Sequence, residues 1–391
     1  MKEFELSLDQ LNDITATLRE RITEGLAEDG KELKCLATYL GVPQGDQSGQ
    51  ALVIDTGGTN MRAALVTLQP RNGQINSGPI SAKVRGGRHG QPVEGSDFFK
   101  EQAELTQGLE LPDETLPLGY CFSYPAACQP DGDAVLLSWT KGINITGVIG
   151  KPVGQPLMKA LADEGVPTEG LSVLNDTVAS LLGGAHLYAD PRFGNNYIGL
   201  ILGTGTNMAG VFSSNQLRKV ESDYPMVVNL ESGNFHPPHL SEYDDVVDRE
   251  STYPGTQRLE KAISGHYLPY LFNQVRPGVF DPAEGTGVLV KMRDNKQEHG
   301  EIAAAILKRS ARLAAAGIAA LASFYPADRD TAVLGEGSLL WGDPQYAPCM
   351  EQTLKELLPD RNIELVRQRD NVNLLGAASA AISQRKVQLS R

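Results

Sequence analysis

The hydrophobic pattern switches repeatedly between helical and strand-like spacing along the chain, which predicts an α/β protein. Near the N-terminus, a capping-box sequence from Ser7 to Gln10 introduces apolar residues at helical spacing: Leu8, Leu11, Ile14, Leu18 and Ile22. A second, shorter helix is expected from Leu33 to Leu40, and an alanine-rich helix from Glu301 to Phe324. We expect the N-terminal helix to cover a core rather than to take part in chemistry.

Two stretches share a pattern of strand, glycine turn and strand. In residues 51–66 an apolar run leads into Asp-Thr-Gly-Gly-Thr-Asn and a second apolar run, and residues 198–211 repeat this order around Gly-Thr-Gly-Thr-Asn. An ungapped overlay pairs four residues with four others: Gly58, Thr59, Asn60 and Met61 with Gly205, Thr206, Asn207 and Met208. Each stretch predicts a β-hairpin, and their match indicates an internal repeat.

The two hairpin tips differ in charge. Asp55 overlays on Leu202 and Arg62 on Ala209, so only the first copy can hold a metal through the end of its strand. Glycines at a turn let main-chain N–H groups approach a ligand closely, which suits phosphate. Either hairpin alone is better explained as an ordinary glycine turn, but the pair together favours a clamp for a polyphosphate.

Two further strands end in polar residues. One apolar run stops at Ser123 and Tyr124, and a later one stops at Asn175 and Asp176, where a helix of small and apolar residues begins. Open α/β sheets bind ligands at such strand ends. Asp176 could simply cap the helix, or it could accept a proton, because a helix N-terminus favours an ionised carboxylate. The two interpretations are compatible.

Composition limits the partners and the setting. The 391 residues are 41% apolar and 21% charged, which suits a globular protein with two lobes. The formal net charge of −13 argues against a nucleic-acid partner and slows the encounter with anionic ligands, which we therefore expect to arrive with Mg²⁺. The four cysteines form no CxxC pair, so we expect buried thiols in the reducing cytoplasm. No apolar run has the length of a signal peptide or a membrane span.

Several stretches, in sequence order, resemble the hexokinase family in its short form with a single catalytic unit. They are residues 55–62, 117–125, 139–142, 173–178, 199–207, 229–235, 242–251 and 254–261. The resemblance implies an α/β, two-lobed actin-like ATPase fold, built from duplicated RNase H-like domains around a central cleft. The expected small lobe comprises 50–172 with 374–391, and the expected large lobe comprises 1–49 with 173–373.

The resemblance also implies the reaction, which is transfer of the γ-phosphoryl group of ATP to the 6-hydroxyl of glucose or a related hexose, the first step of glycolysis. Asp176 is the implied general base, and Lys141 is a second implied catalytic residue. The implied sugar ligands are Ser123, Tyr124, Thr140, Lys141, Asn175, Asp176, Asn207, Glu231 and Glu260. Without the resemblance, Glu260 would be interpreted as an exposed helical charge.

ATP and Mg²⁺ are the implied cofactors. Asp55 would hold Mg²⁺ through water, and three turns would bind the nucleotide: Gly57, Gly58, Thr59, Asn60 and Arg62; Gly203, Thr204, Gly205 and Thr206; and Gly335, Gly337 and Ser338. In hexokinases the Gly-Ser of the third turn touches the adenosine. Neither a Walker motif nor a Rossmann fingerprint competes with this assignment. Hexose and ATP are the expected partners, nucleic acid and membrane are not, and homodimer formation is left open.

The chain departs from the family pattern near the sugar and the adenosine. Ser232 stands where the family commonly has Trp, and His236 stands where it has an acidic residue, so the preferred hexose stays open. The segment before Gly376 holds one glycine where the family has several. A narrow glucokinase and a weakly catalytic, sugar-sensing actin-like ATPase module are the alternatives. The presence of Asp176 and Lys141 together with the whole sugar set favours an enzyme.

Overall fold

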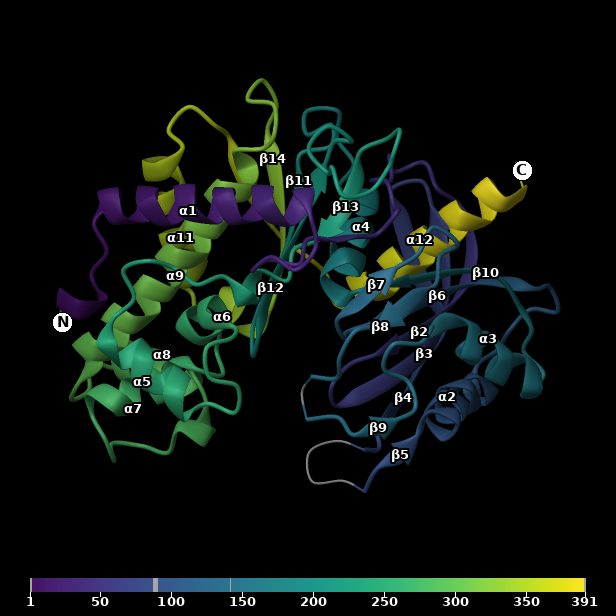
Figure 1. Cartoon of the computed structure of the whole chain (residues 1–391), viewed down its shortest axis with the longest axis horizontal. Coiled ribbons are helices and arrows are strands. Elements are labelled where there is room, and N and C mark those ends of the chain that lie inside the picture. Colours follow the sequence, from purple (N-terminus) through teal and green to yellow (C-terminus); the bar gives the residue numbers. More distant parts are fainter. Residues whose placement is uncertain (1, 87–90, 141, 390–391) are drawn as a thin grey trace. The chain divides into compact units, whose positions relative to one another are not determined.

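The computed structural model describes residues 2–86, 91–140 and 142–389, with backbone only at 386–389. The chain packs into two compact units, each assembled from three segments (Figure 1). The first unit comprises Met1–Cys35, Arg192–Glu221 and Leu230–Gln368, and the second comprises Leu36–Pro191, Ser222–Asn229 and Arg369–Arg391. The lobe boundaries expected from the motifs stay a prediction.

The second unit is built on a five-stranded sheet with the order β10-β6-β2-β3-β4. Its strands are β2 (Gly49–Thr56), β3 (Asn60–Gln69), β4 (Asn72–Lys83), β6 (Leu116–Phe122) and β10 (Thr168–Leu174). β2, β3 and β4 pair antiparallel, whereas β6 lies parallel to both β2 and β10. Every residue of β6 is buried, as expected for a strand with parallel neighbours and a covered face on each side.

Helices cover both faces of this sheet. They are α2 (Gly95–Glu104), α3 (Gly154–Asp163), α4 (Asp176–Leu187) and α12 (Val372–Leu389). Side chains of α2 and α3 share a core with Leu118 and Tyr120 of β6, whereas the intervening Gly119 faces α12. A Cβ on Gly119 would lie 2.4 Å from the Ala377 carbonyl oxygen, so glycine is what lets α12 approach the sheet this closely.

Short elements complete the second unit. β1 (Leu36–Ala37) pairs antiparallel with β13 (Met226–Asn229), β5 (Val93–Glu94) pairs parallel with β9 (Ile145–Thr146), and β7 (Ala126–Cys128) pairs antiparallel with β8 (Ala134–Leu136). A 3-10 turn, η2 (Leu105–Gly108), extends α2.

The first unit contains four strands in the order β12-β11-β14-β15. They are β11 (Tyr197–Leu202), β12 (Thr206–Phe212), β14 (Thr331–Glu336) and β15 (Ile363–Arg367). β11 and β12 form an antiparallel hairpin, and β14 lies parallel to β11 and β15. The carboxyl ends of β11 and β14 therefore lie at the same edge of the sheet.

Three long helices of the first unit pack against one another: α1 (Leu8–Ala27), α9 (Gly300–Ala322) and α11 (Tyr346–Leu357) (Figure 1). Shorter helices surround them: η1 (Lys2–Phe4), η3 (Ser232–Asn234), α5 (Glu242–Glu250), α6 (Arg258–Ile263), α7 (Leu268–Val275), η4 (Pro282–Glu284), α8 (Gly287–Asp294) and α10 (Ser338–Gly342). Among the described residues, no helix combines the length and apolar character needed to cross a membrane.

Most of the predicted elements are confirmed. The capping box at Ser7 and Gln10 starts α1, and both glycine-tipped hairpins are present as β2–β3 and β11–β12. The helix expected from Leu33 to Leu40 is wrong. Cys35 and Tyr39 have φ values of 44° and 58°, which an α-helix cannot accommodate, and the segment instead forms β1 and a loop.

Candidate functional site

Three strand ends of the second unit meet at one edge of its sheet. β2 and β6 are in register at Asp55 and Cys121, and β10 aligns Leu174 with the same cysteine. Parallel pairing therefore brings the polar residues that follow each strand to a common edge: the turn after Asp55, the tip at Ser123, and the start of α4 after Leu174. The sequence pattern marked these polar strand ends as places where a ligand could bind, and the strand pairing brings the three together.

Asn175 and Asp176 start helix α4. The Asn175 side chain caps the helix by accepting from the Thr177 N–H at 2.9 Å, and Asp176 Oδ1 accepts from the same N–H at 2.8 Å. The interpretation of Asp176 as the helix cap is therefore wrong, because Asn175 takes that position. Asp176 is the first helical residue, where the helix dipole favours a negative charge, and it is half-buried.

Asp55 lies against an arginine of the neighbouring strand. It is 6% exposed, and its Oδ2 accepts from Nε of Arg62 at 2.8 Å and from Nη2 of the same guanidinium. The Nη1 group of Arg62 donates to Asn371 Oδ1 at 2.6 Å, and Asn373 Nδ2 donates to Asp55 Oδ2 at 3.4 Å. The residues just before and within the first turn of α12 are thus joined to the first glycine turn.

Cys121 lies in the same neighbourhood as the two aspartates. Burial raises the pKa of the Cys121 thiol well above its ordinary value, and the negative charges of Asp55 and Asp176 raise it further. The thiol therefore stays protonated, and it accepts a long hydrogen bond, 3.9 Å, from Asn373. Cys121 therefore adds no negative charge to this edge of the sheet.

The residues after β6 support the first glycine turn. Ser123 N–H donates to the Thr56 carbonyl at 3.1 Å, and the buried Tyr124 donates its hydroxyl to the Gly57 carbonyl at 2.6 Å. Trp139 packs edge-on against Tyr124, with ring centroids 4.8 Å apart, and precedes the half-buried Thr140. Lys141 lies outside the described residues.

The first turn itself is open. Gly57 N–H donates to the Asn60 carbonyl at 3.0 Å, and the Thr59 carbonyl accepts from Val84, so the turn is held at both ends. Thr59 and Asn60 are exposed, and a Cβ on Gly57 would meet only the Asn60 carbonyl oxygen, at 3.6 Å. There is space beside this main chain for a ligand.

In the first unit, three of the predicted sugar ligands lie around the second hairpin. Asn207 Oδ1 accepts from Ser232 N–H at 3.1 Å, directly beside Glu231. Glu260 Oε2 accepts from Thr206 N–H at 3.0 Å. Glu231 has a left-handed backbone with φ of 55°, which costs a residue with a side chain about 1 kcal/mol and is the kind of strain that gathers at binding sites.

The second glycine turn is held by the chain that follows α6. Gly265 N–H donates to the Gly203 carbonyl at 2.7 Å, and His266 N–H donates to the Thr204 carbonyl at 3.1 Å. Gly205 leaves little room, because a Cβ there would lie 2.9 Å from Glu260 Oε2. One amide of the predicted phosphate loop, that of Thr206, is thus engaged by the carboxylate of a predicted sugar ligand.

The third predicted turn begins later than expected. Gly335 lies inside β14, and its carbonyl accepts from Trp341 Nε1 at 2.9 Å. Gly337 follows the strand with φ of 128°, and a Cβ there would lie 2.1 Å from the Leu202 carbonyl oxygen. Ser338 is exposed and starts α10, next to Gly203. Gly337 and Ser338 therefore form the accessible end of this strand.

Two residues of the second-unit site were not predicted. Asn371 and Asn373 contact Arg62 and Asp55 across more than 300 positions of sequence. The available signal was the pair of asparagines in the glycine-poor segment before Gly376, which the sequence pattern marked only as a departure. Their side-chain amides add hydrogen-bond acceptors and donors around Asp55, whereas glycines have no side chain to offer either.

The residues at Asp55 fit a magnesium ion only in a particular way. Within the described ranges, no group of three or more His, Cys, Asp or Glu side chains is arranged to hold a metal. Mg²⁺ commonly keeps several waters and uses one or two carboxylates plus substrate phosphates. Asp55 supplies the single carboxylate that such a site needs. Because its Oδ2 already accepts a hydrogen bond from Arg62, Asp55 fits a magnesium ion that keeps its bound waters.

Comparisons with known proteins agree with these features. Two models of the hexokinase family match residues 1–186 and residues 197–277 with 293–383. A hexokinase of Emericella nidulans is 33% identical over 72% of this chain and 61% of its own length. Hexokinase-7 of Oryza sativa subsp. japonica is 29% identical over 89% of this chain and 88% of its own.

Solved structures agree as well. The hexokinase from Schistosoma mansoni complexed with glucose has a TM-score of 0.79 and 26% identity, covering 98% of this chain and 97% of its own. A ROK hexokinase from Thermus thermophilus, 18% identical with a TM-score of 0.55 over 87% of this chain and 100% of its own, shares the fold. The predicted α/β actin-like ATPase fold is confirmed. With family models matching nearly its whole length, the chain belongs to the hexokinase family of ATP-dependent hexose kinases.

Proposed function

We propose that this chain transfers the γ-phosphoryl group of ATP to the 6-hydroxyl of glucose or a related hexose, with Asp176 as general base. The observation that carries the proposal is the common sheet edge of the second unit. There, a carboxylate at the start of α4 follows β10, and a glycine turn follows β2, which carries Asp55 near its end. A base for the acceptor and groups for the donor are thus held by β10 and β2, the two strands that pair with β6.

The proposed phosphoryl transfer forms one bond, breaks one bond and moves one proton. The sugar O6 forms a bond to the γ-phosphorus, and the bond from that phosphorus to the β,γ-bridging oxygen breaks. The O6 proton passes to the Asp176 carboxylate, and ADP leaves with the bonding electron pair. Because the transition state of phosphoryl transfer is loose, most of the protein's work is orientation and charge stabilisation.

The donor phosphates are assigned to main-chain N–H groups of the first two turns, Gly57 to Asn60 and Gly203 to Gly205, with Arg62 beside the first. The N–H groups of Gly57 and Gly203 already donate to the carbonyls of Asn60 and Gly205, so they serve the phosphates only if those hydrogen bonds open. Asp55 would hold hydrated Mg²⁺, which supplies neutralisation of the phosphate charge when bound. Ser338 is assigned to the adenosine. The Thr206 amide is engaged by Glu260 at 3.0 Å, so it serves the phosphates only if that hydrogen bond opens.

The sugar is assigned to both units. Ser123, Thr140, Lys141 and Asn175 join Asp176 from the second unit, and Asn207, Glu231 and Glu260 come from the first. Three observations support the first-unit set: the bond between Asn207 and the residue after Glu231, the strained backbone of Glu231, and the fixed carboxylate of Glu260. Together these residues offer both acceptors and donors to uncharged hydroxyl groups.

Glucose is the favoured hexose because the Schistosoma mansoni enzyme was solved with glucose, and a ROK family glucokinase from Streptomyces griseus was solved with glucose and AMPPNP. A narrow glucokinase is the second candidate, because Ser232 and His236 depart from the family pattern and leave the range of accepted hexoses open. The four free cysteines suit the reducing cytoplasm as the proposed setting.

A coupled assay that crosses a panel of hexoses with ATP, GTP and ITP tests the proposal. We expect ADP release that requires both Mg²⁺ and a hexose, with glucose among the best acceptors. Activity with glucose but with no other hexose of the panel would favour the narrow glucokinase. Saturable sugar binding without release of a nucleoside diphosphate in any combination would favour the sugar-sensing module and contradict the proposed reaction.

A further inference from the structure

Helix α6, which carries Glu260, is only six residues long. It begins after Gln257, whose backbone is left-handed with φ of 52°, and no side chain caps its start. Isolated helices of this length are not stable in water, so tertiary contacts must hold α6 in place. The nature of those contacts decides how accurately Glu260 is oriented.

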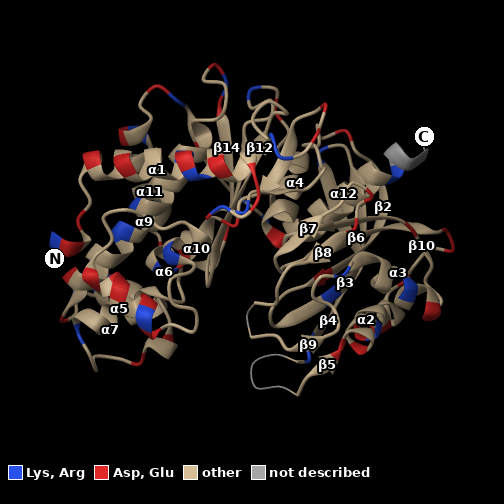
Figure 2. Cartoon of the chain, in the orientation of Figure 1, with Lys and Arg blue, Asp and Glu red and all other residues tan. Residues whose placement is uncertain are grey.

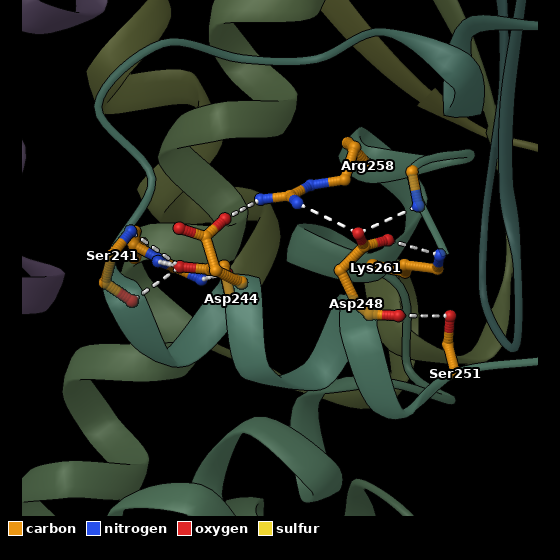
Figure 3. Close-up of polar contacts among 9 residues, drawn as sticks. Ser241, Asp244, Asp248, Ser251, Arg258 and Lys261 are labelled. Atoms are coloured by element: carbon orange, nitrogen blue, oxygen red, sulfur yellow. Dashed lines mark hydrogen bonds and ion pairs between the residues drawn. The ribbon is translucent and has the colours of Figure 1, made fainter. Parts of the chain in front are cut away.

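A group of four charged residues joins α6 to α5. We call it the α5–α6 ion cluster; it consists of Asp245, Asp248, Arg258 and Lys261 (Figure 3). Lys261 Nζ donates to Asp248 Oδ1 at 2.6 Å, and Arg258 Nη1 lies 3.1 Å from Asp248 Oδ2. The second Nη group of Arg258 donates to Asp245. In Figure 2 the ribbon of α5 is mostly red, for acidic residues, and α6 carries blue positions, for basic residues.

The centre of the cluster is buried. The side chains of Lys261, Arg258 and Asp248 are 3%, 7% and 7% exposed. Burial raises the pKa of Asp248, but hydrogen bonds from Lys261 and Gly255 and the charges of Lys261 and Arg258 lower it more, so it ends below its ordinary value. Asp248 is therefore ionised at neutral pH and holds both cations.

The cluster also fixes the loop that leads into α6. Asp248 Oδ2 accepts from Gly255 N–H at 2.9 Å, and Lys261 Nζ donates to the Tyr253 carbonyl at 2.7 Å. The same two side chains thus hold the helix and the turn before it. On the other side, Asp244 of α5 accepts from both Nη groups of Arg309 at 2.6 and 2.7 Å, which anchors α5 to the long helix α9.

Glu260 lies on a different face of α6 from the cluster. Arg258 and Lys261 are three residues apart and share one face, toward α5, whereas Glu260 reaches Thr206 N–H of β12. A Cβ on Gly233 would lie 3.2 Å from Glu260 Cβ, so η3 packs closely against this side. The carboxylate therefore sits at the end of a continuous series of contacts through α9, α5 and α6.

We propose that the α5–α6 ion cluster positions Glu260 for the sugar, with Lys261 and Asp248 as positioning residues that set hexose affinity. This inference rests on the proposed function, because it takes Glu260 as a sugar ligand. A purely stabilising role explains the arrangement less well, since buried ion pairs are often no more stable than apolar residues of the same size. They do fix geometry, and geometry is what a hydroxyl-binding carboxylate needs.

The test uses the paired variant Asp248→Asn/Lys261→Met, which removes both charges of the buried pair, while Arg258 keeps its hydrogen bond to Asp245. We expect the KM for glucose to rise by about 10- to 100-fold, as when groups that orient a ligand are lost, with kcat and the KM for ATP changed by less than about threefold. The single variant Lys261→Arg, with Asp248 intact, should keep most of the wild-type affinity for glucose, because it keeps the positive charge.

The matched control is Arg293→Met/Asp343→Asn. This pair is also buried, with distances of 2.7 Å, but it joins α8 to the end of α10 rather than to α6. Thermal melting should fall for both paired variants, while only the cluster variant should raise the KM for glucose. Equal rises in KM in the two variants would make the cluster merely structural and overturn the proposal.

A double-mutant comparison completes the test. In a Glu260→Gln background, the cluster variant should cause little further rise in the KM for glucose, because both changes act through one carboxylate. If the cluster variant raised the KM for glucose by the same factor in the Glu260→Gln background as in the wild type, the proposal would be overturned. A chain that phosphorylates no hexose at all would overturn the proposed function together with this inference, whereas an active chain whose cluster variant keeps its glucose KM would overturn this inference alone.

Discussion

At the scale of single residues, Asp55 and Asp176 show how one residue type acquires two roles. Asp55 is nearly buried and shares Oδ2 with the guanidinium of Arg62. Asp176 is half-buried at the start of α4, and its hydrogen bonds come from Thr177. The first environment suits the proposed hydrated Mg²⁺ ion, and the second leaves the carboxylate of Asp176 partly exposed for its proposed contact with the sugar hydroxyl.

Replacing Asp176 by Asn should lower kcat by about 10²- to 10⁴-fold, the usual contribution of a positioned general base. Glucose affinity measured by calorimetry should change only a few-fold, because the amide keeps an acceptor at the same site. Asp163→Asn is the matched control, since Asp163 is an exposed carboxylate of the same unit that pairs with Lys159. Turnover close to wild type in Asp176→Asn would remove this residue from the mechanism.

Replacing Arg62 by Met should raise the KM for ATP by about tenfold or more, because hydrogen bonds to charged groups contribute about 1.5–3 kcal/mol. The change removes the bonds to Asp55 and Asn371 and so loosens the first glycine turn. Initial rates at varied ATP and fixed Mg²⁺ would measure it, with exposed Lys159→Met as control. A large rise in the KM for glucose, with that for ATP unchanged, would contradict this assignment.

At the scale of elements, the crossing of α4 and α12 sets the position of the proposed base. A Cβ on Gly376 would lie 1.7 Å from the Ala179 carbonyl oxygen, and a Cβ on Gly183 would lie 2.3 Å from the Val372 carbonyl oxygen. The two helices therefore meet backbone to backbone. Because α4 starts at Asp176 and α12 carries Asn373 near its start, this contact couples the base to the surroundings of Asp55.

Gly376→Ala should destabilise the fold by about 2 kcal/mol or more, since inserting a methyl group into such a contact requires the helices to separate. Urea unfolding would measure the loss, and kcat should fall with it. Gly287→Ala serves as control, because a Cβ there meets nothing within 4 Å. Equal stability of the two variants would show that the crossing is looser than described.

At the scale of the whole molecule, the proposed sugar ligands are divided between the two compact units. Asn175 and Asp176 belong to the second, and Asn207, Glu231 and Glu260 belong to the first. The proposed function therefore assigns one sugar to ligands from both units.

Glucose without nucleotide should slow amide hydrogen exchange in both units, around the start of α4 in one and around η3 and α6 in the other. Binding energy that acts on both units must suppress local opening in both. A hexose that the substrate panel shows not to bind is the control. Protection confined to one unit, at a glucose concentration that saturates the enzyme, would contradict the division of ligands.

The sequence by itself determined what depends on neighbouring residues. Both glycine-tipped hairpins, the capping box at Ser7 and the change from strand to helix at Asn175 are encoded over a few positions. Their hydrogen bonds close within the same short stretch, so local spacing is enough to predict them. The match of motifs in order then carried the family, and with it the fold.

Only the tertiary structure decided which distant groups meet. The bonds of Arg62 to Asn371, of Thr206 to Glu260 and of Lys261 to Asp248 join separate segments, and periodicity reports burial rather than the identity of a partner. The segment from Leu33 to Leu40 shows the same limit of local patterns. Its leucines have helical spacing, but the segment pairs with β13 and contains positive φ angles, so it is not a helix. Packing between elements, which no local pattern contains, overrode helical propensity there and selected the partners of each charged group.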